Sequence, residues 1–264
     1  MDNRSQTIAL TIAGSDSGGG AGIQADLKTF MRFGVFGTSV ITAVTAQNTL
    51  GVRGWERVSP DLVRLQIDAV AEDLRPAAIK SGMLGDAEVV SAVAAGIRAH
   101  RLAPYVLDPV MVATSGDLLL EPDAVRGIVS KLFPLATLVT PNLDEASLLV
   151  GETVRDVDSM ERAARRCVEQ LGAAAALVKG GHLDGDAVVD VLYDGAILRR
   201  FSRPRVGTTS THGTGCTLSS AIAALLATGN TLEDAVERAL DFVHRAIASA
   251  PSLGAGHGPL NHFA

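Results

Sequence analysis

Short apolar runs alternate with longer stretches in which apolar residues recur at helical spacing, and this alternation continues along almost the whole chain. The pattern is typical of strand–helix–strand units, in which helices cover a mainly parallel sheet. The predicted strands are 7–13, 39–46, 77–81, 105–107, 136–140, 174–178, 188–193 and 197–202, and the predicted helices are 22–33, 60–73, 87–100, 122–133, 143–150, 159–171, 217–227 and 232–250. We therefore expect an α/β fold that binds ligands beyond the carboxyl ends of its strands.

The chain shows no internal boundary. Its 264 residues are 47% hydrophobic, which is enough apolar material for a large core. No linker rich in Pro and Ser, no repeat and no low-complexity tract divides it. We expect a single domain over residues 1–264, despite a length that allows two.

Charge, apolar runs and cysteines exclude several classes of partner. With Lys+Arg 23 against Asp+Glu 29, the net charge is -6, so the chain lacks the basic surface that nucleic acids require. The longest uninterrupted apolar run, 221–227, is far shorter than the roughly 20 residues of a membrane span. Cys167 and Cys216 are too few for a disulfide framework. We expect a cytoplasmic protein without a nucleic-acid or membrane partner.

A glycine-rich segment, residues 14–22, follows the first predicted strand. Glycines let backbone N–H groups approach a ligand closely, but the same composition is typical of a flexible loop. The segment does not fit the dinucleotide pattern G-x-G-x-x-G, and no Gly-Lys dipeptide occurs in the chain, so a Walker A loop is excluded. Both readings of the segment stay open on composition alone.

A second polar cluster, residues 207–217, runs directly into an apolar predicted helix. Consecutive N–H groups at a helix start, backed by the helix dipole, form an anion site. Cys216 lies at this start, where the pKa of a thiol tends to fall, so it is a candidate base or nucleophile. The alternative is that Cys216 is a small packing residue, which position alone favours. Cys167 lies within an amphipathic helix and is expected to pack.

Carboxylates and one amide follow two other predicted strands. Asp108 ends one strand, and Asn142, Asp144 and Glu145 follow another. Such oxygen ligands suit a Mg²⁺ ion that keeps some of its waters and bridges phosphate oxygens. Helix capping is the alternative, because Asn142 is a good N-cap and Glu145 stands three positions later.

Two of the four lysines, Lys80 and Lys179, end apolar strands, and either could neutralise phosphate charge. Sequence position does not rank them. Gln47 and Met83 also follow apolar strands. A Gln side chain can pair with a heteroaromatic ring that carries an amine, and Met packs against ring faces. Filling of gaps in the core is the alternative for both residues.

Taken together in this order, the segments 21–28, 46–49 and 212–217 resemble those of the hydroxymethylpyrimidine/phosphomethylpyrimidine kinases of thiamine biosynthesis, within the ribokinase-like superfamily. The resemblance extends from Thr11 to the tail at 256–262. It implies a ribokinase-like fold, a three-layer αβα sandwich whose mainly parallel central sheet has helices on both faces. One loop departs from the family pattern, because residues 16–19 read Asp-Ser-Gly-Gly where relatives commonly have Asp-Pro-Ser-Gly.

The resemblance also implies an activity and a set of site residues. The activity is ATP-dependent phosphorylation of 4-amino-5-hydroxymethyl-2-methylpyrimidine and then of its monophosphate. The implied substrate-binding residues are Gly14, Ala21, Asp26, Gln47, Met83 and Val110, with ring hydrogen bonds from Gln47 and Asp26; the implied catalytic residues are Gly213, Thr214 and Gly215 as an anion hole, Cys216 as base and Lys179; the implied Mg²⁺ ligands are Asp108, Asn142 and Glu145. ATP and Mg²⁺ are the implied cofactors, with a monovalent cation as a further candidate, and the implied assembly is a homodimer.

Two other functions remain as alternatives to this pyrimidine kinase. Relatives with the same Cys-containing loop phosphorylate pyridoxal or pyridoxine, so a pyridoxal kinase is the nearest enzymatic alternative. A non-catalytic pyrimidine carrier is the alternative of a different class, but such a binder has no use for a site that holds metal and phosphate.

Overall fold

The centre of the computed structural model, which describes residues 6–111 and 121–264, is a twisted sheet. Its strands in the described residues are β1 (Ile8–Ala13), β2 (Phe36–Ile41), β5 (Ala78–Ser81), β6 (Tyr105–Leu107), β7 (Leu138–Val139), β8 (Ala176–Val178), β9 (Ala187–Tyr193) and β10 (Leu198–Pro204). The spatial order is β10-β9-β8-β7-β6-β5-β1-β2. Every neighbouring pair from β8 to β2 is parallel, whereas β9 pairs antiparallel with both β8 and β10.

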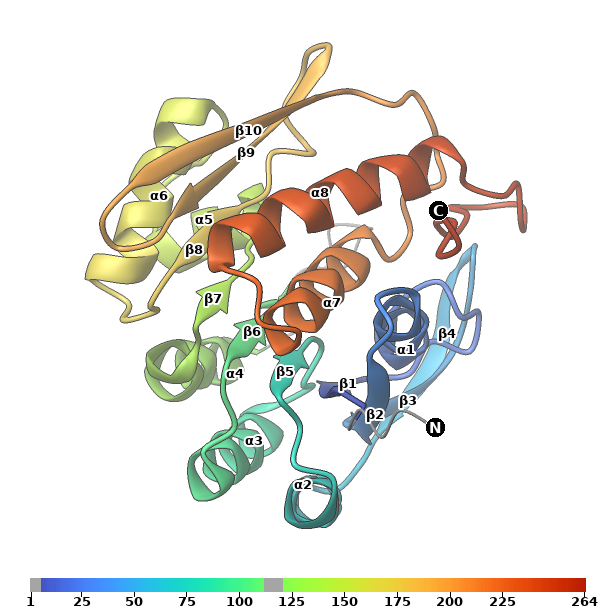
Figure 1. The fold of residues 1–264 in the computed structure, drawn as a ribbon, viewed down its shortest axis with the longest axis vertical. Coiled ribbons are helices and arrows are strands. Elements are labelled where there is room, and N and C mark those ends of the chain that lie inside the picture. Colours follow the sequence, from blue (N-terminus) through green and yellow to red (C-terminus); the bar gives the residue numbers. More distant parts are fainter. Residues whose placement is uncertain (1–5, 112–120) are drawn as a thin grey trace.

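Helices cover both faces of this sheet (Figure 1). On one face lie α1 (Gly22–Arg32), α7 (Thr214–Ala227) and α8 (Leu232–Ala248), which share one apolar cluster with residues of the sheet. On the other face lie α2 (Pro60–Asp73), α3 (Ala87–His100), α4 (Pro122–Gly127), α5 (Leu143–Val150) and α6 (Val157–Glu169), around a second cluster. Burial of the strands on both faces explains why they read as continuous apolar runs. The expected three-layer αβα fold is confirmed.

The predicted strand 39–46 is wrong, because the structure divides this segment between two sheets. β2 ends at Ile41, and β3 (Ala43–Asn48) pairs with β4 (Gly51–Arg57) in a separate antiparallel ribbon. Thr42 forms the junction: its N–H donates to the carbonyl of Ala13 (3.0 Å), and its own carbonyl accepts from Val58 (2.8 Å). β4 was not predicted, since it is exposed along its length and its two apolar residues, Val52 and Trp55, do not alternate with polar ones.

The predicted helix 122–133 also differs from the structure. Regular α-helix stops at Gly127, and a wider turn over Ile128–Leu132 and a 3₁₀ turn over Phe133–Leu135 follow. Pro134 lies within that last turn and has no N–H to continue an α-helical ladder, which accounts for the change. No helix in the described part of the chain combines the length and apolar character that a membrane span requires.

Candidate active site

The parallel strands bring the predicted polar residues to one edge of the sheet. Gly14 follows β1 and donates its N–H to the carbonyl of Met83 (3.2 Å), which follows β5. Asp108 follows β6, and beyond β7 and β8 a parallel bridge joins Asn142 to Lys179. Five segments far apart in sequence therefore meet at the carboxyl ends of adjacent strands, as expected for a ligand site in this type of sheet.

Asp108 and Lys179 form an ion pair at this edge. Lys179 Nζ lies 3.0 Å from Asp108 Oδ1, and the Thr140 hydroxyl donates to the same oxygen at 3.2 Å. The first turn of α7 lies against this pair: a Cβ atom added to Gly215 would stand 3.2 Å from Lys179 Nζ and 3.3 Å from Asp108 Oδ2. Only glycine lets the backbone approach so closely without displacing the two side chains.

Backbone donors lie at the start of α7, in the turn beside this pair. Within residues 6–111 and 121–264, the N–H groups of Gly213, Gly215 and Cys216 have no acceptor, whereas the N–H of Thr214 is directed at the carbonyl of Thr211 (3.3 Å). Unpaired N–H groups at a helix N-terminus attract anions, and the adjacent Lys179 adds a positive charge. The arrangement suits an anion hole. The structure directs the Thr214 N–H away from it and adds the Cys216 N–H, which the sequence analysis had not included.

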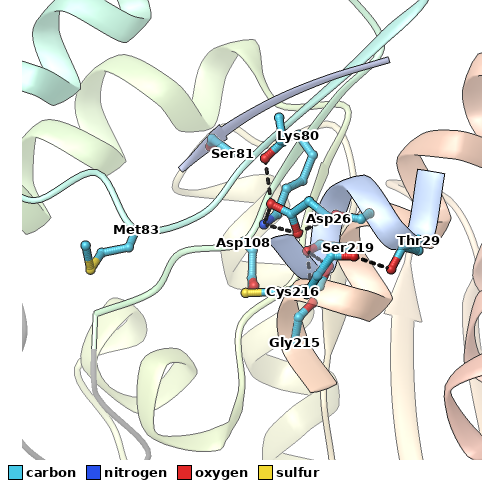
Figure 2. Close-up of polar contacts among 12 residues, drawn as sticks. Asp26, Thr29, Lys80, Ser81, Met83, Asp108, Gly215, Cys216 and Ser219 are labelled. Atoms are coloured by element: carbon cyan, nitrogen blue, oxygen red, sulfur yellow. Dashed lines mark hydrogen bonds and ion pairs between the residues drawn. The ribbon is translucent and has the colours of Figure 1, made fainter. Parts of the chain in front are cut away.

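The thiol of Cys216 lies beside Asp108 in this turn (Figure 2). Burial raises its pKa to about 11; the negative charges of Asp26 and Asp108 act in the same direction, and the positive charge of Lys80 opposes them. The expected lowering of this pKa is therefore wrong for the unliganded protein, because desolvation outweighs the helix start and the nearby lysine. Cys167 is fully buried in the apolar core, and burial raises its pKa to about 12.

Asp26 lies beneath the site, inside the core, with no exposed surface. Its carboxylate contacts Lys80 Nζ at 3.0 Å through both oxygens, and it accepts from the hydroxyls of Thr11 (2.6 Å) and Ser220 (2.7 Å). The expectation that Asp26 hydrogen-bonds a substrate ring does not fit this position, because both oxygens already have partners. The same contacts rank the two lysines: Lys80 is buried with Asp26, and Lys179 faces the open edge.

Asn142 and Glu145 form a capping box at the start of α5. Asn142 Oδ1 accepts from the Glu145 N–H (2.9 Å), and Glu145 Oε2 accepts from the Asn142 N–H (2.8 Å). Burial and the negative charge of Asp108 raise the pKa of Glu145 to about 7, and Lys179 opposes this. The capping alternative is confirmed for Asn142 and Glu145, and the Mg²⁺ role of these residues stays a prediction.

The carboxyl groups of Asp108 and Glu145 suit a Mg²⁺ ion that also binds water and phosphate better than a metal ion whose ligands all come from the protein. The described residues contain no group of three or more His, Cys, Asp and Glu side chains placed to hold a metal. Mg²⁺ commonly takes one or two carboxylates and completes its shell with water and substrate phosphates. Asp108 and Glu145 match that number of carboxylates, and a bound cation would relieve their mutual repulsion.

Gln47, near the end of β3, lies beside the glycine-rich loop that follows β1 and forms the wall of the site there. Ser17 holds its backbone through two hydrogen bonds, of 2.7 Å to the Gln47 carbonyl and 2.8 Å from its N–H. The side-chain oxygen of Gln47 faces the Thr45 hydroxyl at 3.4 Å, and within the described residues its amide nitrogen has no partner. A free amide group fixed in this way can recognise a polar ring.

Other residues expected to bind the substrate lie around the same loops. Met83 packs on Gly14, where an added Cβ would stand 2.6 Å from the methionine methyl group. Ala21 precedes α1 and is half-buried. Val110 is half-buried and donates its N–H to the Asp108 carbonyl (2.9 Å).

Asp16 and His212, which were not predicted as site residues, are in contact in the structure. Asp16 is 1% exposed, and its carboxylate accepts from the N–H groups of Gly18 (2.8 Å), Gly20 (3.1 Å) and Ala21 (2.8 Å). Its Oδ2 also lies 2.8 Å from His212 Nε2. Burial opposes ionisation, but the hydrogen bonds from His212 and the loop N–H groups lower the pKa of Asp16 to about 2. An Asp that opens a glycine-rich loop was the available signal, because Asp side chains readily accept from nearby backbone donors.

Comparison with known proteins agrees with this geometry. A sequence model of phosphomethylpyrimidine kinases matches residues 16–261. The chain belongs to this family. A hydroxymethylpyrimidine/phosphomethylpyrimidine kinase of Rhizobium meliloti (strain 1021) is 52% identical over 258 residues, covering 97% of both chains. A thiamine biosynthesis bifunctional protein of Geobacter sulfurreducens is also 52% identical, over 96% of this chain and 52% of its own length.

Solved structures extend the similarity of this phosphomethylpyrimidine kinase family member to pyridoxal kinases. The crystal structure of an ADP complex of Bacillus subtilis pyridoxal kinase has a TM-score of 0.92 and 38% identity, covering 98% of both chains. The resemblance noted in the sequence is confirmed, and so is the ribokinase-like arrangement of layers.

Proposed function

We propose that the protein phosphorylates 4-amino-5-hydroxymethyl-2-methylpyrimidine and then its monophosphate, with ATP as donor, in thiamine biosynthesis. Membership of the phosphomethylpyrimidine kinase family supports this activity. The single observation that carries the proposal is the set of N–H groups at the start of α7 that have no acceptor among the described residues, in the turn that lies against the Asp108–Lys179 pair. Phosphoryl transfer depends mainly on positioning and on stabilisation of negative charge, and this arrangement supplies both.

Gln47 is proposed to recognise the pyrimidine ring through its side-chain amide, whose nitrogen would donate a hydrogen bond to the ring. Met83 would pack against the ring, with Gly14, Ala21 and Val110 as neighbouring contacts. The backbone bonds from Ser17 support this role, since they hold Gln47 in place before substrate binds. Asp26 is assigned instead to holding Lys80 in the core.

The N–H groups of Gly213, Gly215 and Cys216 would bind the oxygens of the transferring phosphoryl group, and Lys179 would neutralise them as a point charge. Mg²⁺, held by Asp108 and Glu145 beside Asn142, would supply further charge neutralisation at the phosphates. Cys216 would accept the proton of the substrate hydroxyl. Its raised pKa makes the thiolate a stronger base but reduces its population at neutral pH.

Incubation of purified protein with Mg-ATP and the pyrimidine alcohol tests the activity directly. We expect the monophosphate to appear first and the diphosphate afterwards. Chromatography and mass spectrometry detect both products. Absence of both products would overturn the proposal. Retained binding of the pyrimidine without ATP turnover would identify the protein as a carrier.

Pyridoxal phosphorylation is the second candidate, supported by the structural similarity to the Bacillus subtilis enzyme. A side-by-side measurement of kcat/KM on the pyrimidine alcohol and on pyridoxal decides between them. We expect the pyrimidine to be preferred.

We also propose that the protein is a cytoplasmic homodimer that folds as one domain. The ribbon of β3 and β4 carries exposed apolar side chains, Val44 (55%), Val52 (53%) and Trp55 (53%), which a second copy could cover. Sedimentation equilibrium measures the mass directly, and a Trp55→Glu variant is expected to shift it towards the monomer. A monomeric wild-type protein at micromolar concentration would exclude this assembly.

A further inference from the structure

Asp16 and His212 connect the two loops that contain the proposed ring and phosphoryl sites. Asp16 lies in the loop between β1 and α1, and His212 directly precedes the first turn of α7. The two side chains meet at 2.8 Å; the His212 side chain is 16% exposed and that of Asp16 is almost completely buried. One carboxylate therefore orders the loop around residues 18–21 and also holds the residue before the anion hole.

The backbones of these two loops touch where the side chains meet. A Cβ atom added to Gly213 would stand 1.9 Å from the carbonyl oxygen of Gly20, and one added to Gly20 would stand 2.6 Å from the His212 ring. Gly213 also has a positive φ of +82°, which glycine adopts at little cost. A small displacement of either loop is therefore transmitted to the other, because no space separates them.

His212 is also connected to the wall that carries Gln47. The His212 N–H donates to the carbonyl of Gly258 (3.2 Å), and in the same tail the His257 N–H donates to the carbonyl of Thr49 (2.9 Å), two residues beyond Gln47. Ser17, one residue after Asp16, binds the Gln47 backbone through two hydrogen bonds. Four segments thus form a closed circuit of contacts around the site.

We propose that Asp16 and His212 are positioning residues, whose contact fixes the distance between the ring-binding wall and the anion hole at the start of α7. Neither residue has to touch the reacting atoms. The inference rests on the proposed kinase function for its kinetic consequence. Loss of the contact lets the anion hole drift from the hydroxyl that accepts the phosphoryl group, and a displacement of about 1 Å can cost roughly 10²-fold in rate.

Three variants test this proposal by steady-state kinetics. His212→Leu removes the donor to Asp16, and we expect kcat to fall about 100-fold while KM for the pyrimidine changes less than about threefold. His212→Gln places an amide N–H near the position of Nε2, and we expect it to recover at least tenfold of that loss. His100→Leu is the matched control, because His100 forms a similar 2.6 Å contact with Asp68 between α3 and α2, and we expect its kcat to be unchanged.

Hydrogen exchange measured by mass spectrometry on the same variants does not depend on activity. We expect His212→Leu to accelerate exchange in both segments 14–22 and 207–217, and His100→Leu to leave both unchanged. Unaltered exchange in either segment of His212→Leu, or a kcat in His212→Gln as low as in His212→Leu, would overturn the proposal. An inactive wild-type protein with the expected exchange pattern would instead contradict the kinase function alone.

Discussion

Lys80 and Asp26 form a 3.0 Å ion pair in which neither side chain has any exposed surface. The pair joins β5 to α1, and the hydroxyls of Thr11 on β1 and Ser220 on α7 complete it. Four elements beneath the active site are thus held together by one satisfied polar cluster (Figure 2). Such a cluster rigidifies a core when every member is paired, and it is costly when one is removed.

Lys80→Met is expected to lower the free energy of unfolding by about 3–5 kcal/mol, because it leaves the Asp26 carboxylate buried without a counter-charge. Replacing both partners, as Lys80→Met with Asp26→Leu, is expected to recover part of that loss. Urea unfolding of the two variants measures the difference. A double variant less stable than Lys80→Met alone would contradict this account.

Cys216→Ser is expected to lower kcat by roughly 10² to 10⁴-fold, the usual contribution of a general base, while KM for the pyrimidine changes little. Cys167→Ala serves as the control, since Cys167 lies on α6 and is buried in the apolar core. Initial rates at saturating ATP measure the effect. An unchanged kcat in Cys216→Ser would show that Cys216 is a packing residue and not the base.

Alkylation of Cys216 by iodoacetamide is expected to be slow at pH 7 and to accelerate about tenfold per pH unit up to pH 10, since only the thiolate reacts. The rate rises with pH because burial raises the pKa of Cys216 to about 11. Below that value, each increase of one pH unit multiplies the thiolate fraction about tenfold. Mass spectrometry of the peptide containing Cys216 follows the reaction in the unliganded protein. A rate that reaches its plateau below pH 8 would show a lowered pKa instead.

Gln47→Ala is expected to raise KM for the pyrimidine by about tenfold or more and to alter kcat much less, because the amide contacts the ring in both ground and transition states. Gln170→Ala, at the exposed end of α6, is the matched control. Kinetics and calorimetric binding of the pyrimidine provide the measurement. A fall in kcat with KM unchanged would remove Gln47 from ring recognition.

Gly215→Ala is expected to lower kcat by about tenfold or more with little loss of stability, because its methyl group would press on the Asp108–Lys179 pair at 3.2–3.3 Å. Gly213→Ala is expected to reduce both kcat and the free energy of unfolding. Gly213 has a φ of +82°, and a Cβ atom there would stand 1.9 Å from the Gly20 carbonyl oxygen. Gly207→Ala, with no atom within 4 Å, is the control. Equal rates for Gly215→Ala and Gly207→Ala would contradict the assigned role of this turn.

Periodicity predicted most of the elements because the parallel strands are buried on both faces and the helices show one apolar face. Helices at 60–73, 87–100 and 143–150 have the predicted bounds, and Ser59 and Thr231 cap their helices as side-chain acceptors. The junction at Thr42 was not predictable in this way, since the strands on both sides of it are similar in composition and only their pairing differs.

Strand ends predicted where polar residues would gather, but not which side chains face the site. Asp26 on α1 pairs with Lys80 on β5, a contact between residues 54 positions apart that local sequence does not contain. The pKa of Cys216 depends likewise on desolvation by several elements, which outweighs the local effect of the helix start. His212 and Asp16 are 196 positions apart, and only the folded chain shows their contact.

The contact of residues 256–259 with Thr49 and His212 affects the order in which the protein can become active during translation. β1 lies inside the sheet and can pair with β2 early, yet the loops beside it lack these contacts until a segment more than two hundred positions later has been synthesised. A nascent chain can therefore acquire most of its core before the loops of the candidate site are held by all of their contacts.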